Sequence, residues 1–249
     1  MPTYRLGKHP KRVDARTLQF RNYLTDGLPP PPMAVTYERA VKYWPVMGNN
    51  DHQDCTVAAA GHLVEDWTAN TRAEPVVIPE TEILAAYRVV SGGEDSGAAM
   101  LTVLKYWRKT GIAGHRIDAF AEVSKGHHAE TRQAVAIFGG AYVGLGLPDF
   151  AAHPPDGNLD TVPWAVPASG VKENPPNPHN GHCVPIVGYD AKQFWVVTWG
   201  KLKSMTPEFY AAYSDEVYAV LSPYWSTPGL PAPPGFNLKQ LQADLSKIQ

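Results

Sequence analysis

The sequence contains only two cysteines, Cys55 and Cys183, and no pair of cysteines separated by two residues. This shortage excludes a disulfide-dense secreted scaffold, a zinc ribbon and a thioredoxin-like site. No apolar run approaches the ~20 residues that a membrane-spanning helix needs. Basic and acidic residues nearly balance, 22 against 24, so we expect neither nucleic acid nor a membrane as a partner. We expect no cofactor, and the histidines, His127 and His128 included, form no metal-ligand set.

Proline, in contrast, is abundant: 24 of the 249 residues, about twice ordinary usage, which predicts long loops. The hydrophobic content of 44% supports a packed globule. Residues 1–28 are polar and basic without an apolar stretch, so we expect no signal peptide and a cytoplasmic or virion-associated location. They are also too short and too weakly helical for an inhibitory pro-segment, and we interpret them as an N-terminal extension.

The spacing of apolar residues predicts helices in the first half of the chain and strands in the second. The expected helices are 56–71, 80–90, 97–110 and 129–138, and the expected strands are 141–147, 183–189, 194–198 and 217–221. This segregation is typical of an α+β fold. We divide the chain into the 1–28 extension, a body at 29–225 with lobes at about 45–120 and 121–225, and a Pro-rich linker with a C-terminal helix at 226–249.

Cys55 lies at the predicted start of the first helix, where the helix dipole favours a thiolate. A thiolate is the nucleophile of cysteine hydrolases, although a cysteine beside an Ala-rich helix is also a common small core residue. We expect this thiol near the surface. Asp54 precedes it, and a carboxylate there opposes a low thiol pKa.

A histidine opens a later apolar strand, in the run H-C-V-P-I-V-G-Y at 182–189, and the next strand ends in V-T-W-G at 197–200. With Cys55 upstream, this order resembles the papain-like cysteine peptidases, whose histidine opens a strand H-A-V-x-I-V-G-Y and whose next strand closes on N-S-W-G. Weaker matches lie at 45–50, 79–82, 94–98 and 109–112. The resemblance covers roughly residues 28–222 and is closest to divergent bacterial or phage-type members.

The resemblance implies an α+β, papain-like two-lobed fold with a helical left lobe, a β-rich right lobe and extended N-terminal and C-terminal tails. It implies a thiol peptidase or amidase that cleaves a peptide bond in a peptide or protein substrate. Cys55 would form the thioester intermediate, and His182 would act as the acid and base.

Further site residues follow from the same resemblance. Asn49, six residues before the nucleophile, takes the place of the family's oxyanion glutamine, and Gln53 is the substitute candidate. His52 and Trp199 are expected along the substrate cleft, with Trp199 shielding the active-site hydrogen bond. We interpret the Asp95-Ser96-Gly97 run as a helix cap.

The chain departs from the family at the residue that orients the histidine. Val197 replaces that asparagine, so Thr198 is the nearest polar candidate, provided that the strand is locally shortened. Asp190 is the other candidate, and a Cys–His dyad is the third option. Cys183 follows His182 on the strand and is expected to be a buried thiol on the opposite face.

Three alternatives to an active peptidase remain open. The first is a catalytically weak papain-fold protein that serves as a structural or binding module in a larger assembly such as a phage particle. The second is a peptidoglycan amidase, because Asp54-Cys55 resembles the start of such enzymes. The third is a transglutaminase-like acyl transferase, which expects a trailing aspartate.

The C-terminal residues 236–248 predict an amphipathic helix with Asn237 as its N-cap. Four apolar residues share one stripe: Leu238, Leu241, Leu245 and Ile248. Because so short a helix is marginal alone, something must cover this stripe. Two coverings remain open: the chain's own body, or a second copy or particle partner reached through the Pro-rich linker.

Overall fold

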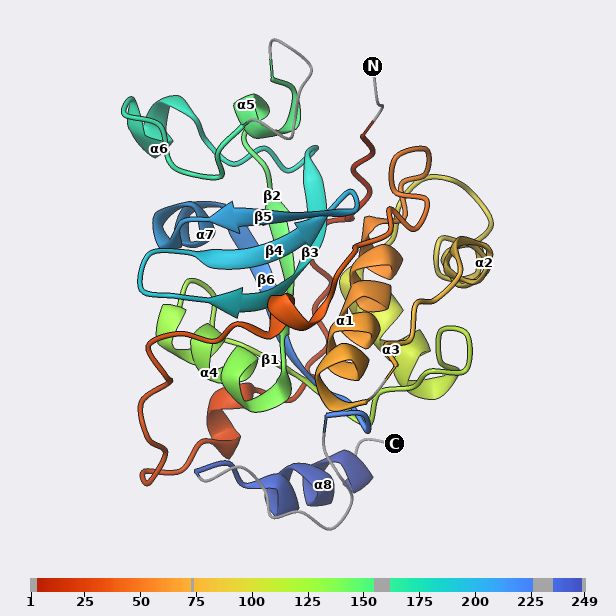
Figure 1. Ribbon diagram of the computed structural model, residues 1–249, viewed down its shortest axis with the longest axis vertical. Coiled ribbons are helices and arrows are strands. Elements are labelled where there is room, and N and C mark those ends of the chain that lie inside the picture. Colours follow the sequence, from red (N-terminus) through yellow and green to blue (C-terminus); the bar gives the residue numbers. More distant parts are fainter. Residues whose placement is uncertain (1–3, 73, 155–161, 226–234, 248–249) are drawn as a thin grey trace.

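The computed structural model describes residues 4–72, 74–154, 162–225 and 235–247 (Figure 1). Its helices are η1 Phe20–Tyr23, η2 Tyr37–Ala40, α1 Cys55–Thr71, α2 Glu80–Val90, α3 Met100–Lys109, α4 His128–Phe138, α5 Asp149–Ala152, α6 Gly170–Glu173, α7 Pro207–Tyr213 and α8 Leu238–Lys247. Its strands are β1 Ala119–Glu122, β2 Ala141–Gly146, β3 Gly181–Tyr189, β4 Phe194–Thr198, β5 Lys201–Met205 and β6 Ser214–Leu221. The predicted α+β class is confirmed, while the lobe boundary near residue 120 stays a prediction.

The six strands form one antiparallel sheet in the order β1-β6-β2-β3-β4-β5. Helices α1, α2 and α3 lie together on one side of this sheet, on the right of Figure 1. The central strands β2 and β3 are buried along their whole length. Both faces of β3 are therefore covered, and the residues at the start of this strand are buried as well.

The two faces of the sheet belong to two hydrophobic cores. Cys183 packs with the helical core that contains Leu63 and Trp107, whereas Val184 belongs to the second core with Phe209. Successive side chains of a strand point to opposite faces, which accounts for this division. The structure therefore places Cys183 on the helical side of β3.

Helix α1 is buried along most of its length and packs directly against β3. Trp67 fixes its far end: the indole Nε1 donates a 2.8 Å hydrogen bond to the carbonyl of Phe138, and its ring stacks on Trp107 at 5.7 Å. None of the helices in the described ranges is long and apolar enough to cross a bilayer. The packing of α1 against β3 places the first turn of this helix beside the start of the strand.

The sequence analysis missed two strands and five helices, which are short or polar: β1, β5, η1, η2, α5, α6 and α7. Strand β5 forms a hairpin with β4 through Trp199 and Gly200, both of which have positive φ, 48° and 72°. The expected helix at 97–110 begins at Met100 instead, because Gly97 has φ of 89° and Ala99 is the N-cap. The interpretation of Asp95-Ser96-Gly97 as the cap of this helix was therefore wrong.

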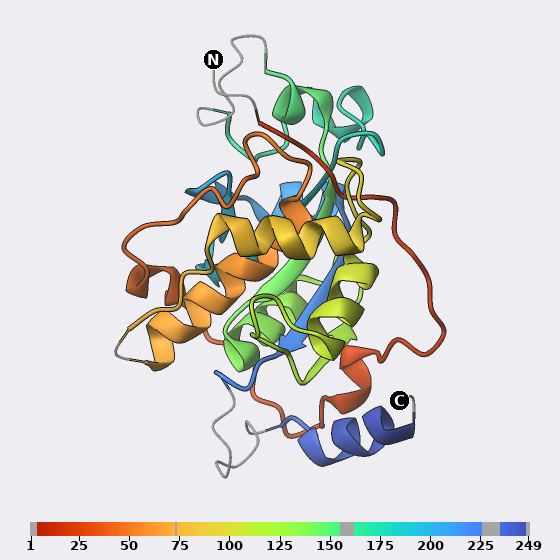
Figure 2. The same cartoon turned by 90° about the vertical axis from the view of Figure 1, so that its right-hand side faces the viewer.

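Both terminal segments pack on the body, and α8 lies beside η1 (Figure 2). Phe236 stacks on Phe20 at 5.9 Å, and Leu241 is 1% exposed. The Tyr23 hydroxyl donates a 3.2 Å hydrogen bond to Asp244. The stripe of α8 thus faces its own chain, although Ile248 and linker residues 226–234 lie outside the described residues. Docking of 236–248 on a second chain stays a prediction.

Candidate active site

Cys55 begins α1, and its sulfur lies within hydrogen-bonding reach of the backbone amides of Cys183 and Gly7. Its side chain belongs to the helical core, and the residue is only 1% exposed, so the expectation of a thiol near the surface was wrong. Burial raises the thiol pKa to about 12, although the two amides lower it. The thiol is therefore neutral in this arrangement.

His182 lies at the start of β3 with no exposed surface. A 2.7 Å hydrogen bond joins its Nε2 to the hydroxyl of Thr198, and its ring stacks on Trp199 with centroids 4.6 Å apart. Burial lowers the imidazole pKa to about 3. The register of β3 with β4 shifts between Ile186 and Gly188, where β3 carries one extra residue.

Val197, which replaces the orienting asparagine, and Asp190, the other candidate for the orienting role, both lie elsewhere. Val197 packs in a small apolar cluster with Trp44 and Val187. The Asp190 carboxylate accepts hydrogen bonds from the backbone amides of Lys192 and Gln193 in the turn after β3. Thr198 is therefore the polar side chain that contacts the imidazole.

Asn49 presents its side-chain amide to a backbone carbonyl. Its Nδ2 lies 3.3 Å from the oxygen of Arg5 and 3.2 Å from that of His52. The indole Nε1 of Trp199 donates to the same Arg5 oxygen at 3.2 Å. Two donors thus converge on one peptide carbonyl beside the Cys55 loop.

Gln53 and His52 are held by Asp95, a contact that the sequence analysis missed. The Asp95 carboxylate accepts from the Gln53 backbone amide at 2.8 Å, and the Gln53 side-chain amide donates to the Asp95 carbonyl at 2.7 Å. His52 Nδ1 lies 3.5 Å from the same carboxylate. The side-chain amides of Gln53 and Asn49 are therefore both engaged: that of Gln53 by the Asp95 carbonyl, and that of Asn49 by the carbonyls of Arg5 and His52.

Within the described ranges, no hydrogen bond joins the Cys55 thiol to the His182 ring, and His182 Nδ1 is buried without a partner. Since the thiol and the imidazole are both neutral, the arrangement holds no thiolate–imidazolium pair. Asp54 is fully buried, and burial raises its pKa to about 8, so it is mostly protonated at neutral pH. The negative charge expected beside the thiol is thereby largely removed.

Residues 4–9, which we call the N-terminal segment, run between the helical side and the sheet side of this site (Figures 1 and 2). Gly181 accepts hydrogen bonds from the backbone amides of Gly7 and Lys8, at 3.1 and 2.9 Å. Ala98 donates to the Gly7 carbonyl at 2.8 Å and accepts from His9 at 3.0 Å. Residues interpreted only as an extension therefore lie directly over Cys55.

Glycines make this close approach possible on both sides. A Cβ on Gly7 would lie 1.9 Å from the Gln53 carbonyl oxygen, and one on Gly181 would lie 2.0 Å from the Lys8 oxygen. On Gly97 it would lie 2.2 Å from the Gly7 oxygen. These three glycines are the sequence signal that could have indicated a backbone-to-backbone contact.

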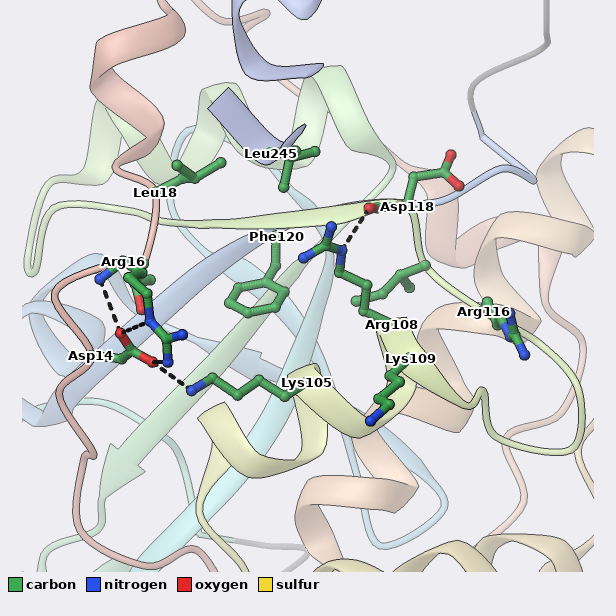
Figure 3. Close-up of a pocket in the computed structure, with 12 residues that line it drawn as sticks. Asp14, Arg16, Leu18, Lys105, Arg108, Lys109, Arg116, Asp118, Phe120 and Leu245 are labelled. Carbon is green, nitrogen blue, oxygen red and sulfur yellow. Dashed lines mark hydrogen bonds and ion pairs between the residues drawn. The ribbon is translucent and has the colours of Figure 1, made fainter. Parts of the chain in front are cut away.

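A separate cavity of about 730 Å³ lies near the end of α3 and the start of β1 (Figure 3). Several of its charged groups pair locally: Asp14 accepts from Arg16 and Lys105 at 2.7 and 2.6 Å, and Arg108 donates to the Asp118 carbonyl at 3.2 Å. It contains neither cysteine nor histidine. In the part of the chain that the structure describes, no group of three or more His, Cys, Asp or Glu side chains could hold a metal ion.

No protein-family model matches the chain, and no curated protein matches its sequence. Solved structures do match. Xylellain, a cysteine protease from Xylella fastidiosa, has a TM-score of 0.65 at 14% identity, over 87% of this chain and 96% of that chain. The Carica candamarcensis cysteine protease CMS1MS2 has a TM-score of 0.57 at 15% identity, over 77% of this chain and 99% of that chain. The cysteine protease and lectin-like domains of Cwp84 from Clostridium difficile have a TM-score of 0.60 at 13% identity, over 88% of this chain and 56% of that chain.

These likenesses define the fold. The chain has the papain-like cysteine protease fold, as the order of its motifs predicted. At 13–15% identity they do not extend to activity, substrate or origin, so a bacterial or phage-type source stays a prediction.

Proposed function

We propose that the protein is a thiol-dependent peptidase or amidase with Cys55 as its nucleophile. The observation that carries this proposal is the meeting of the first turn of α1 with the start of β3, where the Cys55 sulfur lies against the backbone amide of Cys183. The residue before Cys183 is the histidine whose ring is bonded to Thr198 and stacked on Trp199. In a papain-like fold, the nucleophile and the base of a hydrolase meet where this helix start contacts this strand start.

In the proposed reaction, His182 takes the thiol proton and the Cys55 thiolate attacks the carbonyl carbon of the scissile peptide bond. The oxyanion forms near the Asn49 amide and the backbone amide of Cys55. His182 then protonates the leaving amine, which leaves a thioester on Cys55. Water, deprotonated by His182, hydrolyses the thioester and restores the thiol.

The Asn49 amide supports its proposed role through the contact it already makes. It donates to the Arg5 carbonyl, a peptide oxygen held over the site by the N-terminal segment. A donor that binds one peptide carbonyl there is suited to bind another. His52 and Gln53, held by Asp95, would form part of the adjoining substrate surface.

A papain-fold binding module with weak or no catalysis is the second candidate. The observation that favours it is the protonation state: burial raises the thiol pKa to about 12 and lowers the imidazole pKa to about 3. An enzyme needs this pair to ionise, which requires the N-terminal segment to withdraw and admit water. The two candidates therefore differ in whether the segment leaves the thiol.

Alkylation with an epoxide or iodoacetamide probe, read by mass spectrometry, separates the candidates. Cys55 should react in preference to Cys183, which serves as the matched buried control. Hydrolysis of a peptide library should disappear in Cys55→Ala and persist in Cys183→Ala. Equal, slow labelling of both thiols would support the binding module, and turnover retained in Cys55→Ala would exclude the mechanism.

The substrate panel should include peptidoglycan peptides beside ordinary peptides. Cleavage confined to the former would indicate the amidase alternative. Amide exchange onto an added amine without hydrolysis would indicate the transglutaminase-like alternative. A cytoplasmic or virion-associated location is part of the same proposal and is tested by fractionating the source cells and particles.

A further inference from the structure

Lys8 carries a buried charge into the middle of the candidate site. Its side chain is 1% exposed, and its ammonium lies 2.8 Å from Asp215 and 3.3 Å from Glu216. The Glu216 side chain has no exposed surface and also accepts a 3.0 Å hydrogen bond from Tyr218. The Asp215 side chain is 37% exposed, whereas the charges of Lys8 and Glu216 are buried and need a partner, so this lysine and Glu216 depend on one another.

The pocket that receives Lys8 is built by elements of both cores. Gly144 on β2 leaves the room: a Cβ there would lie 2.7 Å from Asp215 Oδ1, 2.7 Å from the Met100 sulfur and 2.8 Å from Glu216 Cγ. Met100, at the start of α3, is fully buried. The buried Lys8 side chain therefore ends at two acids that pack closely beside Gly144 and Met100, a site that we call the Lys8 socket.

The rest of the N-terminal segment is held mainly through its backbone. Gly7, Lys8 and His9 bond to Ala98 on one side and to Gly181 on the other, contacts that any extended peptide can make. Lys8 is the residue of this stretch whose side chain enters a charged pocket. Sequence discrimination at this position therefore rests on the Lys8 socket.

We propose that Asp215 and Glu216 form a specificity subsite for lysine or arginine, which Lys8 occupies in this structure. The inference rests on the proposed peptidase function. When the N-terminal segment withdraws, an incoming extended peptide with a basic side chain restores the buried ion pair. An apolar side chain leaves the buried Glu216 with the Tyr218 hydroxyl but without a cation, and an acidic one adds repulsion.

The test is an exchange measurement that needs no catalysis. A site-specific protease sequence is inserted after Val13, which is 86% exposed, in the full-length Cys55→Ala chain. The folded protein is cleaved, and fluorescent peptides spanning residues 4–13 are titrated by anisotropy. The parent peptide and its Lys8→Arg form should bind, whereas Lys8→Leu and Lys8→Glu should bind at least about tenfold more weakly.

Lys11→Leu is the matched control, because Lys11 pairs with Glu122 at a partly exposed position and should change affinity less than about twofold. Glu216→Gln should reduce the preference for lysine over leucine. Equal affinities for the parent and Lys8→Leu peptides would overturn the subsite.

If the cleaved segment does not exchange, the rate of Cys55 alkylation in intact chains is the deciding measurement. Lys8→Leu should then speed labelling at least about tenfold while Lys8→Arg and Lys11→Leu do not, and equal rates overturn the proposal.

Failure of the subsite and failure of the proposed function give different results. Selective peptide binding without hydrolysis by the Cys55-containing protein would remove the peptidase function and leave the subsite. Hydrolysis with no preference for a basic residue in the peptide would remove the subsite and leave the function.

Discussion

Thr198 supplies the imidazole contact that the expected asparagine would have made. A hydroxyl can hold one imidazole tautomer as an amide can, but it is smaller and has only one rotating donor. The ring is also confined by stacking on Trp199. At this site, orientation therefore comes from one hydrogen bond together with an aromatic wall.

Removing that hydroxyl should impair the histidine without unfolding the protein. In Thr198→Val, kcat should fall about tenfold to a hundredfold with little change in KM, since proton transfer depends on the imidazole position. Thr198→Ser keeps the hydroxyl and should stay near the parent rate. Nitrogen NMR of His182 provides a readout besides activity, and an unchanged tautomer and rate in Thr198→Val would contradict the role.

Asp54 should make stability depend on pH. Burial raises its folded pKa to about 8, against 3.8 for the free side chain. Below pH ~4 both states are protonated, and between ~4 and ~8 the unfolded state ionises while the folded state keeps the proton. The stability associated with this group is therefore present at low pH and lost as pH rises through about 8.

Asp54→Asn removes this dependence while keeping the side-chain shape. Its Tm should exceed that of the parent by several degrees more at pH 8 than at pH 4.5, since each kcal/mol is worth about 2–4 °C in a chain of this size. Asp51→Asn, an exposed carboxylate in the same loop, is the control. A Tm difference that does not grow with pH would mean that Asp54 is solvated.

At the scale of elements, the N-terminal segment fits because glycine lines its path. Gly7→Leu should force it away from Gln53, with overpacking strain of about 1–3 kcal/mol. Since 1.4 kcal/mol is tenfold in an equilibrium, Cys55 alkylation should speed up by about fivefold to 150-fold. Gly27→Leu is the control, because nothing lies within 4 Å of a Cβ there. Labelling unchanged in Gly7→Leu would show that the segment does not protect the thiol.

Most helices and strands were predicted because their apolar spacing is regular and local. Helix α2 has the predicted bounds of 80–90, and α1 begins one residue earlier than predicted. The polar strand β5 and the short strand β1 escaped prediction because their formation depends on pairing with β4 and β6. Local periodicity carries no information about such partners.

At the scale of the whole molecule, α8 ties the end of the chain to its beginning. Leu241 is 1% exposed, so Leu241→Ala should destabilise the protein by about 2–5 kcal/mol, measured by denaturant unfolding. Gln242→Ala, exposed on the same helix, should change stability little. An unaffected midpoint in Leu241→Ala would mean that α8 leaves the body in solution and is free to dock elsewhere, which sedimentation of the full chain would then detect.

The sequence by itself determined the α+β class, the order of the elements, and a cysteine and a histidine at the starts of a helix and a strand, because these features depend on local spacing. Only the tertiary structure decided the state of the site. Lys8 meets Asp215 across 207 positions and Gln53 meets Asp95 across 42, which no local pattern encodes. Burial, which sets the pKa values of Cys55, His182 and Asp54, is likewise a property of the packed molecule.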